Sequence, residues 1–116
     1  MLYPRHLVVA DVRAAAAWYA EVFAAVTEAI DDGHARLVIG TAPLVIVLER
    51  GPPPPPAKTP VLELGVVEVA ASLARAVAAG ATRATPESLE HYAQLRDPWG
   101  YLWALALRDD PDDDQA

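Results

Sequence analysis

Two stretches of the chain repeat the same pattern of hydrophobic and polar positions. Residues 6–25, HLVVADVRAAAAWYAEVFAA, align with residues 63–81, ELGVVEVAASLARAVAAGA. In each stretch a polar residue opens a short apolar run, and an acidic residue, Asp11 or Glu68, follows five positions later. A valine then begins an alanine-rich segment. Internal similarity of this kind predicts a duplicated structural unit.

Within each unit the periodicity changes from that of a strand to that of a helix. The β-branched runs at 5–10 and 61–67 predict strands. Apolar positions at helical spacing then predict one helix that begins after Asp11, a good N-cap, and a second that ends just before Gly80. The predicted apolar stripes comprise Val12, Ala15, Ala16, Tyr19, Val22, Phe23 and Val26 in the first helix, and Val69, Leu73, Ala76 and Val77 in the second.

Strand patterns follow each helix. They lie at 27–30, 34–39 and 43–50, with Asp32-Gly33 as a hairpin turn, and at 82–85, 91–96 and 101–108, with the turn Asp97-Pro98-Trp99-Gly100 before the last strand. Each unit therefore has the order β-α-β-β-β, which predicts an α+β fold in which one helix covers one face of a four-stranded sheet. The uncovered faces of two such sheets can enclose a hollow, and we expect a ligand site there.

Length and proline content indicate the domain organisation. The 116 residues suit one domain, which we expect to span residues 1–108, with repeats at 1–50 and 60–108. The connector at 51–59 includes the prolines Pro52–Pro56. Such a run favours an extended segment and could act as a spacer or as a ligand for a proline-binding domain. The matching units on its two sides favour the spacer.

Composition and charge exclude several classes of protein. The chain has no cysteine, so disulfides, thiolate catalysis and cysteine-based zinc sites are excluded. The acidic tail at 109–116, which its composition predicts to be disordered, contributes to the net charge of −7. This charge disfavours nucleic acid and weakly favours a cationic small molecule. No apolar run reaches the roughly 20 residues of a membrane helix, and the N-terminus lacks signal-peptide features. We therefore expect a cytoplasmic protein.

These motifs resemble the vicinal oxygen chelate superfamily, which includes glyoxalase I, bleomycin-resistance proteins and extradiol dioxygenases. HLVVADVRAAAAWYAEVF resembles its opening, and ARAVAAGAT followed by RDPWGYLWALA resembles its second module and closing hairpin. The resemblance covers residues 3–107. It implies paired βαβββ modules around a cup, commonly in a homodimer. In the enzymes a divalent metal, held by His, Gln or Glu on the inner strand faces, polarises two substrate oxygens.

The resemblance places the metal ligands at positions where this chain has other side chains. The first ligand of each module, seven residues before the helix-capping acid, corresponds to Pro4 and Val61. The ligand of the last strand, seven residues after the hairpin aspartate, corresponds to Ala104. The remaining position falls in 44–49, where only Glu49 could serve. Because a hard divalent ion needs several ligands, we expect no metal and no cofactor at the usual site.

Other residues of the same strands could line the cup instead. Positions two apart share a face of a strand, so His6 and Glu63 are expected on the same face as Pro4 and Val61, looking into one cup. The expected ligand-binding residues are His6, Glu63, Tyr92, Gln94, Leu102 and Ala104. His6 could equally be a half-buried histidine bonded to the backbone. We expect Trp18 and Trp103 in the core, His34 on the surface, Trp99 at the rim of the cup or against a partner subunit, and Arg96 and Asp97 as anchors of the hairpin.

These features together favour a metal-independent protein that binds a small organic molecule, for example to sequester an antibiotic or a metabolite, and that forms a homodimer. One alternative is an enzyme, a lyase, isomerase or dioxygenase. In it the pair His6 and Glu63 either acts in acid–base catalysis or forms a displaced metal site together with Glu49. Another is a regulatory or assembly module with a residual cup. The sequence leaves the identity of the ligand open.

Overall fold

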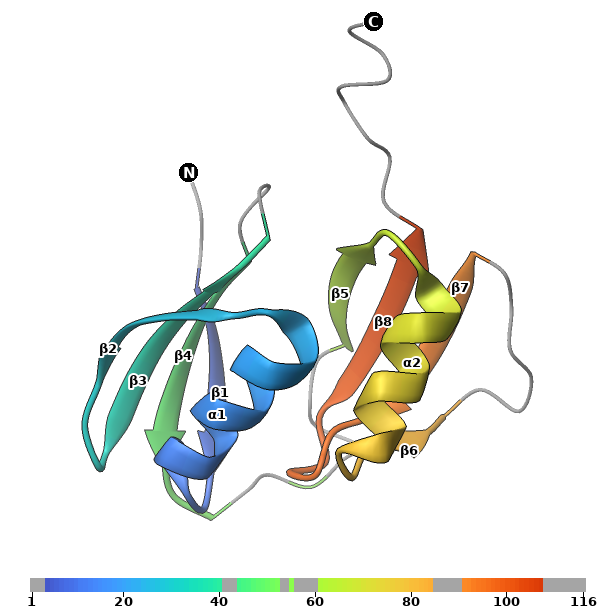
Figure 1. Cartoon of the computed structure of the whole chain (residues 1–116). Helices are drawn as coiled ribbons and strands as arrows, with labels where there is room; N and C mark the ends of the chain where they lie inside the picture. Colours follow the sequence, from blue (N-terminus) through green and yellow to red (C-terminus); the bar gives the residue numbers. More distant parts are fainter. Residues whose placement is uncertain (1–3, 41–43, 53–54, 56–60, 85–90, 108–116) are drawn as a thin grey trace, which may run out of the picture.

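The computed structural model describes residues 4–40, 44–52, 55, 61–84 and 91–107 (Figure 1). The N-terminal module contains β1 (Arg5–Val9), α1 (Val12–Phe23), β2 (Val26–Ile30), β3 (His34–Ile39) and β4 (Leu44–Arg50). The C-terminal module contains β5 (Val61–Val66), α2 (Val69–Ala78), β6 (Thr82–Arg83), β7 (Tyr92–Arg96) and β8 (Leu102–Leu107). The predicted order β-α-β-β-β is confirmed in both modules. The acidic tail and most of the proline run lie outside the described residues.

Each module forms one four-stranded mixed sheet, and the two sheets have the same topology. The strand orders are β1-β4-β3-β2 in the N-terminal sheet and β5-β8-β7-β6 in the C-terminal sheet. The first strand of each module pairs in parallel with the last, and the other neighbours are antiparallel. The predicted α+β fold of two βαβββ modules is therefore confirmed.

The helices begin and end for local reasons. The side chain of Asp11 accepts a hydrogen bond from the backbone N–H of Ala14 at 3.0 Å, so the predicted N-cap is confirmed. The helix α1 ends at Phe23 because Ala24 adopts a left-handed conformation with φ 58°. Val26, expected on the helical stripe, therefore begins β2 and is 64% exposed. Val77 of α2 is also exposed rather than buried, so the sequence prediction was wrong for both valines.

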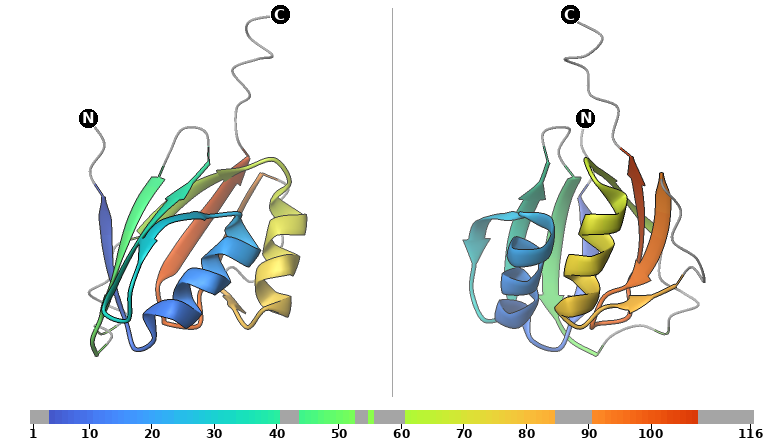
Figure 2. Two further views of the ribbon diagram at one scale, coloured as in Figure 1. Left: turned by 60° about the vertical axis from the view of Figure 1, so that its left-hand side comes forward. Right: turned by 45° about the vertical axis from the view of Figure 1, so that its right-hand side comes forward.

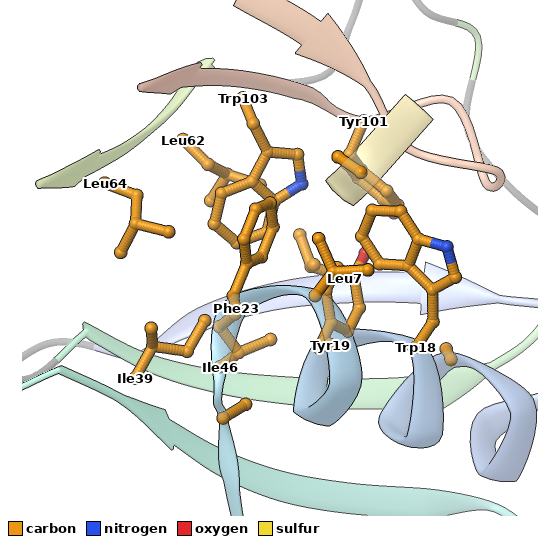
Figure 3. Close-up of a cluster of buried hydrophobic side chains, with 14 of the residues drawn as sticks. Leu7, Trp18, Tyr19, Phe23, Ile39, Ile46, Leu62, Leu64, Tyr101 and Trp103 are labelled. Atoms are coloured by element: carbon orange, nitrogen blue, oxygen red, sulfur yellow. The ribbon is translucent and has the colours of Figure 1, made fainter. Parts of the chain in front are cut away.

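One hydrophobic core serves both modules. Each helix lies across one face of its own sheet and next to the other helix (Figures 1 and 2). Leu62 and Trp103 of the C-terminal sheet and Leu7 and Ile46 of the N-terminal sheet project toward one another, with the α1 side chain Phe23 among them (Figure 3). The core-facing sides of the two sheets are thus directed at each other. In each sheet we call the opposite side, which carries the alternate residues, the outer face.

Aromatic residues fill the centre of this core. Trp18 and Trp103 are buried, as predicted. The Trp99 ring lies 6.0 Å from that of Trp18 and 5.9 Å from that of Tyr19, centroid to centroid. Trp99 is half-buried against the core in these contacts and does not line the outer face of either sheet, while its alternative role against a partner subunit stays a prediction. The helix α1 packs against the Asp97 hairpin because both supply aromatic rings to one cluster.

Asp97 is buried at the junction of the modules and accepts four hydrogen bonds. Its Oδ1 accepts from the backbone N–H groups of Trp99 at 2.9 Å and of Tyr101 at 3.0 Å. Its Oδ2 accepts from the hydroxyl of Tyr19 and from Nε1 of Trp103. The predicted anchoring role of Asp97 is confirmed, and its bond to Tyr19 extends that role to the other module. Burial raises the pKa of Asp97 and also that of Tyr19.

Further side chains join the two modules through backbone groups. The hydroxyl of Tyr101 accepts a hydrogen bond from the N–H of Val8 at 2.6 Å and donates one to the carbonyl oxygen of Val8 at 3.0 Å. Both backbone groups of Val8 at the open edge of β1 therefore have a partner. Nε1 of Trp18 donates to the carbonyl of Ala79 at 2.8 Å. Within the hairpin, Arg96 donates to the carbonyl of Gly100 at 2.9 Å, as its predicted anchoring role requires. These bonds fix how one module sits on the other.

The described part of the chain contains two helices, α1 and α2, and neither is long and apolar enough to cross a membrane.

We expect Tyr101→Phe to lower the free energy of unfolding by about 1–3 kcal/mol, because it leaves the backbone N–H and carbonyl of Val8 without their shared partner. Urea denaturation measures the change. Tyr92→Phe is the matched control, since Tyr92 is exposed and its hydroxyl bonds to Gln94 on the protein surface. We expect the control to change stability by less than about 0.5 kcal/mol. Equal losses in the two variants would contradict a joining role for Tyr101.

The buried Asp97 carboxylate gives a second prediction, on pH. Because burial raises its pKa in the folded state, its stabilising contribution is complete below the ordinary value of 3.8 and is lost as the pH rises through the higher folded value. The difference in unfolding free energy between wild type and Asp97→Asn should therefore shrink as the pH rises from 3.8.

Asp31→Asn supplies the control of opposite sign for the Asp97 experiment. Hydrogen bonds from the backbone N–H groups of Gly33 and His34 lower the pKa of Asp31. Its contribution is therefore present above the ordinary value of 3.8 and is lost as the pH falls. The difference between wild type and Asp31→Asn should grow with pH. Urea denaturation curves across the acidic range measure both trends, and parallel trends in the two variants would refute the assignment.

Candidate functional site

Most of the predicted ligand-binding residues come together on the outer face of the C-terminal sheet. Ala104 of β8 pairs with Glu63 of β5 on one side and with Gln94 of β7 on the other. Tyr92 lies in the adjacent row, opposite Ala106. Leu102 lies in the row on the other side, opposite Arg96. Alternation along the strands places all of these side chains on one face, as the sequence predicted.

This face carries a hollow of about 370 Å³, which we call the outer hollow. It is lined by Glu63, Leu64, Gly65, Tyr92, Ala104 and Ala106. The small residues at 65, 104 and 106 leave the space, while Glu63 and Tyr92 stand at its sides. The Tyr92 hydroxyl accepts a hydrogen bond from Nε2 of Gln94 at 2.7 Å, which orients the phenol. The hollow therefore combines an apolar floor with a carboxylate and a hydroxyl, a composition typical of small-molecule sites.

His6 lies in a different place, on the outer face of the N-terminal sheet. Its Nδ1 is 3.5 Å from Oε1 of Glu49, and the two side chains are 59% and 45% exposed. On the same face, Nε of Arg36 donates to Oε1 of Glu28 at 3.0 Å. His34 is exposed, as predicted. Since the His6–Glu49 pair is open to water, its contribution to stability is small.

His6 and Glu63 do not share a hollow within one chain. Leu7 and Leu62, their neighbours in sequence, point into the same core from the two sheets. Successive side chains of a strand point in opposite directions, so His6 and Glu63 point away from that core on opposite sides of the molecule. The expectation that both look into one cup is therefore wrong for the single chain. The alternation within each strand was predicted correctly, and the relative orientation of the two sheets was not.

The strand register identifies the residue of the N-terminal sheet that corresponds to Ala104 of the C-terminal sheet. Val47 pairs with His6 in the N-terminal sheet in the same way as Ala104 pairs with Glu63 in the C-terminal sheet. Val47, and not Glu49, is therefore the counterpart of Ala104. Neither a valine nor an alanine side chain can coordinate a metal. Within the described ranges, no three His, Asp or Glu side chains group in a way that could hold a metal ion.

Gly65, like Leu64, lines the outer hollow and was not singled out by the sequence reasoning. It pairs with Ala106, one row beyond the Glu63–Ala104 pair. Its signal in the sequence was its position two residues after Glu63, which places it on the same face of β5. A side chain at this position would occupy part of the hollow, so the glycine matters here for the space that it leaves.

Comparison with known proteins identifies the family. Residues 6–106 match the sequence model of the glyoxalase-like domain family, whereas no curated protein sequence matches the chain. The fold is similar to that of the fosfomycin resistance protein FosX from Listeria monocytogenes, with a TM-score of 0.72 and 19% identity over 94% of this chain and 91% of that one.

Two further solved structures share the fold. The bleomycin resistance determinant encoded on the transposon Tn5 has a TM-score of 0.66 and 19% identity over 95% of this chain and 99% of that one. The glyoxalase I of Leishmania major has a TM-score of 0.72 and 16% identity over 92% of this chain and 86% of that one. Given the family match across residues 6–106 and this shared fold, the chain belongs to the glyoxalase-like domain family of the vicinal oxygen chelate superfamily.

Proposed function

We propose that the chain binds a small organic molecule in the outer hollow and does so without the metal used by the enzymes of its superfamily. The observation that carries this proposal is the hollow of about 370 Å³ with an apolar floor beside Glu63 and Tyr92. Its volume lies within the range of about 300–1,000 Å³ that is typical of ligand pockets. Antibiotic or metabolite sequestration is the form of this function that we favour.

The absence of coordinating side chains at the family positions supports binding without a metal. The resemblance gives Pro4, Val61 and Ala104 as ligand positions, and Val47 is the counterpart of Ala104 in the strand register of the N-terminal sheet. All four have hydrocarbon side chains. Such a site offers a divalent ion no coordinating side chains. The same small side chain at Ala104 leaves room for an organic ligand.

The chemistry of the lining favours a ligand with a positive or hydrogen-bond-donating group. Glu63 is exposed at the edge of the hollow, and a carboxylate accepts hydrogen bonds only. The Tyr92 ring offers an aromatic face beside it, which also suits a cation. The net charge of −7 also attracts a cationic ligand weakly. A cationic aromatic compound is therefore the ligand class that we favour.

A homodimer would complete the site, as the family resemblance implies. The outer hollow opens onto one face of a single sheet, and the His6–Glu49 pair lies on the outer face of the other sheet of the same chain. In a dimer, the His6 face of one subunit can cover the Glu63 hollow of its partner. The two expected halves of the cup would then meet between chains. Sedimentation velocity distinguishes this dimer from a monomer.

A rearranged metal site is the second candidate, because His6 and Glu49 already approach each other at 3.5 Å. A third ligand would have to come from a second chain, where Glu63 is the available carboxylate. Such a site would make the protein an enzyme candidate, since a bound metal can polarise a substrate oxygen.

We expect a thermal-shift screen of cationic aromatic compounds and bleomycin to yield compounds that raise the melting temperature, because a ligand of the folded state stabilises it. Ala104→Leu fills the hollow and should abolish the shift. Glu63→Gln should weaken cationic hits about tenfold, since it removes the charge partner. Ala20→Leu, at an exposed position of α1, is the control and should keep the shift. If a compound still raises the melting temperature of the Ala104→Leu variant, it binds outside the outer hollow, which would contradict the proposal.

Titration with Ni²⁺, Mn²⁺, Zn²⁺ and Fe²⁺ separates the two candidates. We expect calorimetry to detect no stoichiometric metal binding to the wild-type protein, because the family positions hold hydrocarbon side chains. One metal ion per chain, lost in His6→Ala and kept in the surface variant His34→Ala, would overturn the metal-independent proposal in favour of the rearranged site.

A further inference from the structure

A second and larger cavity, of about 490 Å³, lies where the two modules meet. We call it the junction cavity. Its walls come from the end of α1 with Ala24, the end of β3 with Gly40, the segment from β5 into α2, and the first turns of α2. The outer hollow lies on the outer face of β5, whereas the junction cavity lies on the side of the core. The two share only Leu64 and Gly65 among their lining residues.

One side of the junction cavity is apolar. Ile39 of the N-terminal sheet and Leu64 of the C-terminal sheet project toward each other at one end of the core, with Phe23 of α1 beside them (Figure 3). These side chains are 2%, 7% and 8% exposed, and each contributes to the lining. The cavity is therefore an opening into the shared core and offers an apolar ligand the same kind of surface that the core buries.

The other side of the junction cavity is one polar face of α2. Glu68, Ser72 and Arg75 stand at helical spacing along it, and all three line the cavity. Ser72 is only 8% exposed and also lines the cavity. A hydroxyl both donates and accepts hydrogen bonds, so Ser72 can donate to an acceptor atom of a ligand in the cavity.

Arg75 provides the positive charge of this polar face. Its Nη1 donates to the carbonyl of Val22 at the end of α1 at 3.3 Å, which holds the guanidinium at the cavity. A guanidinium carries five N–H donors in a planar fork and suits a carboxylate.

The start of α2 adds a backbone donor. Asp11 caps α1 by accepting from the N–H of Ala14, whereas Glu68, the corresponding residue of α2, makes no side-chain cap bond. Ala71, the counterpart of Ala14, lines the cavity. An acceptor brought by a ligand can take the place of the missing cap, where the helix dipole also favours negative charge.

We propose that the junction cavity binds a small carboxylic acid with an apolar chain or ring, at a site separate from the outer hollow. The carboxylate accepts hydrogen bonds from the Ser72 hydroxyl, the Ala71 N–H and Arg75. The apolar part lies against Phe23, Ile39 and Leu64. The negative charge of Glu68 repels the carboxylate of the ligand and so lowers the binding affinity. The ligand class is thus set by three donors at one end and a hydrocarbon wall at the other.

Titration of the full-length ¹⁵N-labelled protein with octanoate tests this proposal. We expect saturable amide shifts that centre on residues 22–24, 39–40 and 64–75, with 1-octanol and octylamine binding at least about tenfold more weakly because they lack the charge that Arg75 recognises. Arg75→Gln should weaken octanoate about tenfold. Glu68→Gln should tighten it, and Ser72→Leu, which fills the cavity, should abolish it.

Arg5→Gln is the matched control for charge, since Arg5 is exposed on β1 away from the cavity, and it should leave octanoate binding unchanged. The Glu68→Gln variant keeps the test decisive if Arg75→Gln unfolds. Absence of saturable shifts, equal binding of 1-octanol or octylamine, or shifts confined to Glu63 and Tyr92 would each overturn the proposal. None of these results affects the Ala104→Leu test, so ligand binding in the outer hollow is tested independently of the junction cavity.

Discussion

The arrangement of the two modules depends on one buried carboxylate. Asp97 accepts bonds from its own hairpin, from Trp103 of β8 and, across the junction, from Tyr19 of α1. Its raised pKa means that the cost of burial exceeds the gain from these bonds, so the ionised group is not there for net stability alone. Its value is geometric, because donors from α1, the hairpin and β8 converge on one carboxylate and so favour this packing of helix, hairpin and sheet.

This packing decides which surfaces remain available for function. Because the core faces of both sheets close on the helices, the two outer faces point away from each other. The polar residues that the family resemblance would gather into one cup are therefore divided between two sides of the chain. On our proposal a second subunit brings such faces together. The junction cavity has a different origin, since it lies where the two modules close imperfectly at one end of the shared core.

Much of the fold could be predicted from the sequence because it follows from local rules. The strand β3 has the predicted bounds, Asp11 caps α1, and the duplicated pattern gives two sheets of the same topology. The outer face of the C-terminal sheet was also predictable, because alternation alone places Glu63, Tyr92, Gln94 and Ala104 together. Each of these conclusions needs only residues that are close in sequence or in one strand ladder.

The errors concern information that local rules do not contain. Alternation assigns a side chain to a face of its own sheet and says nothing of how two sheets face each other. That orientation comes from contacts such as Tyr19 with Asp97 and Tyr101 with Val8, which join residues 78 and 93 positions apart. Val26 was assigned to the helix because its spacing fits, whereas the left-handed Ala24 ends the helix first. A left-handed alanine carries no sequence signal of the kind that a glycine gives.

Loss of coordination and gain of space are the same change at the outer hollow. A carboxylate at position 104 would fill the centre of the row between Glu63 and Gln94, and it would add a negative charge beside Glu63. With alanine there, the floor is apolar and only one carboxylate remains at the edge. On our proposal, hydrocarbon side chains at the positions that the family resemblance gives to metal ligands make this site suited to an organic molecule rather than to a small hard ion. The physical requirement for the proposed function is thus the small volume of Ala104, with Glu63 supplying the charge.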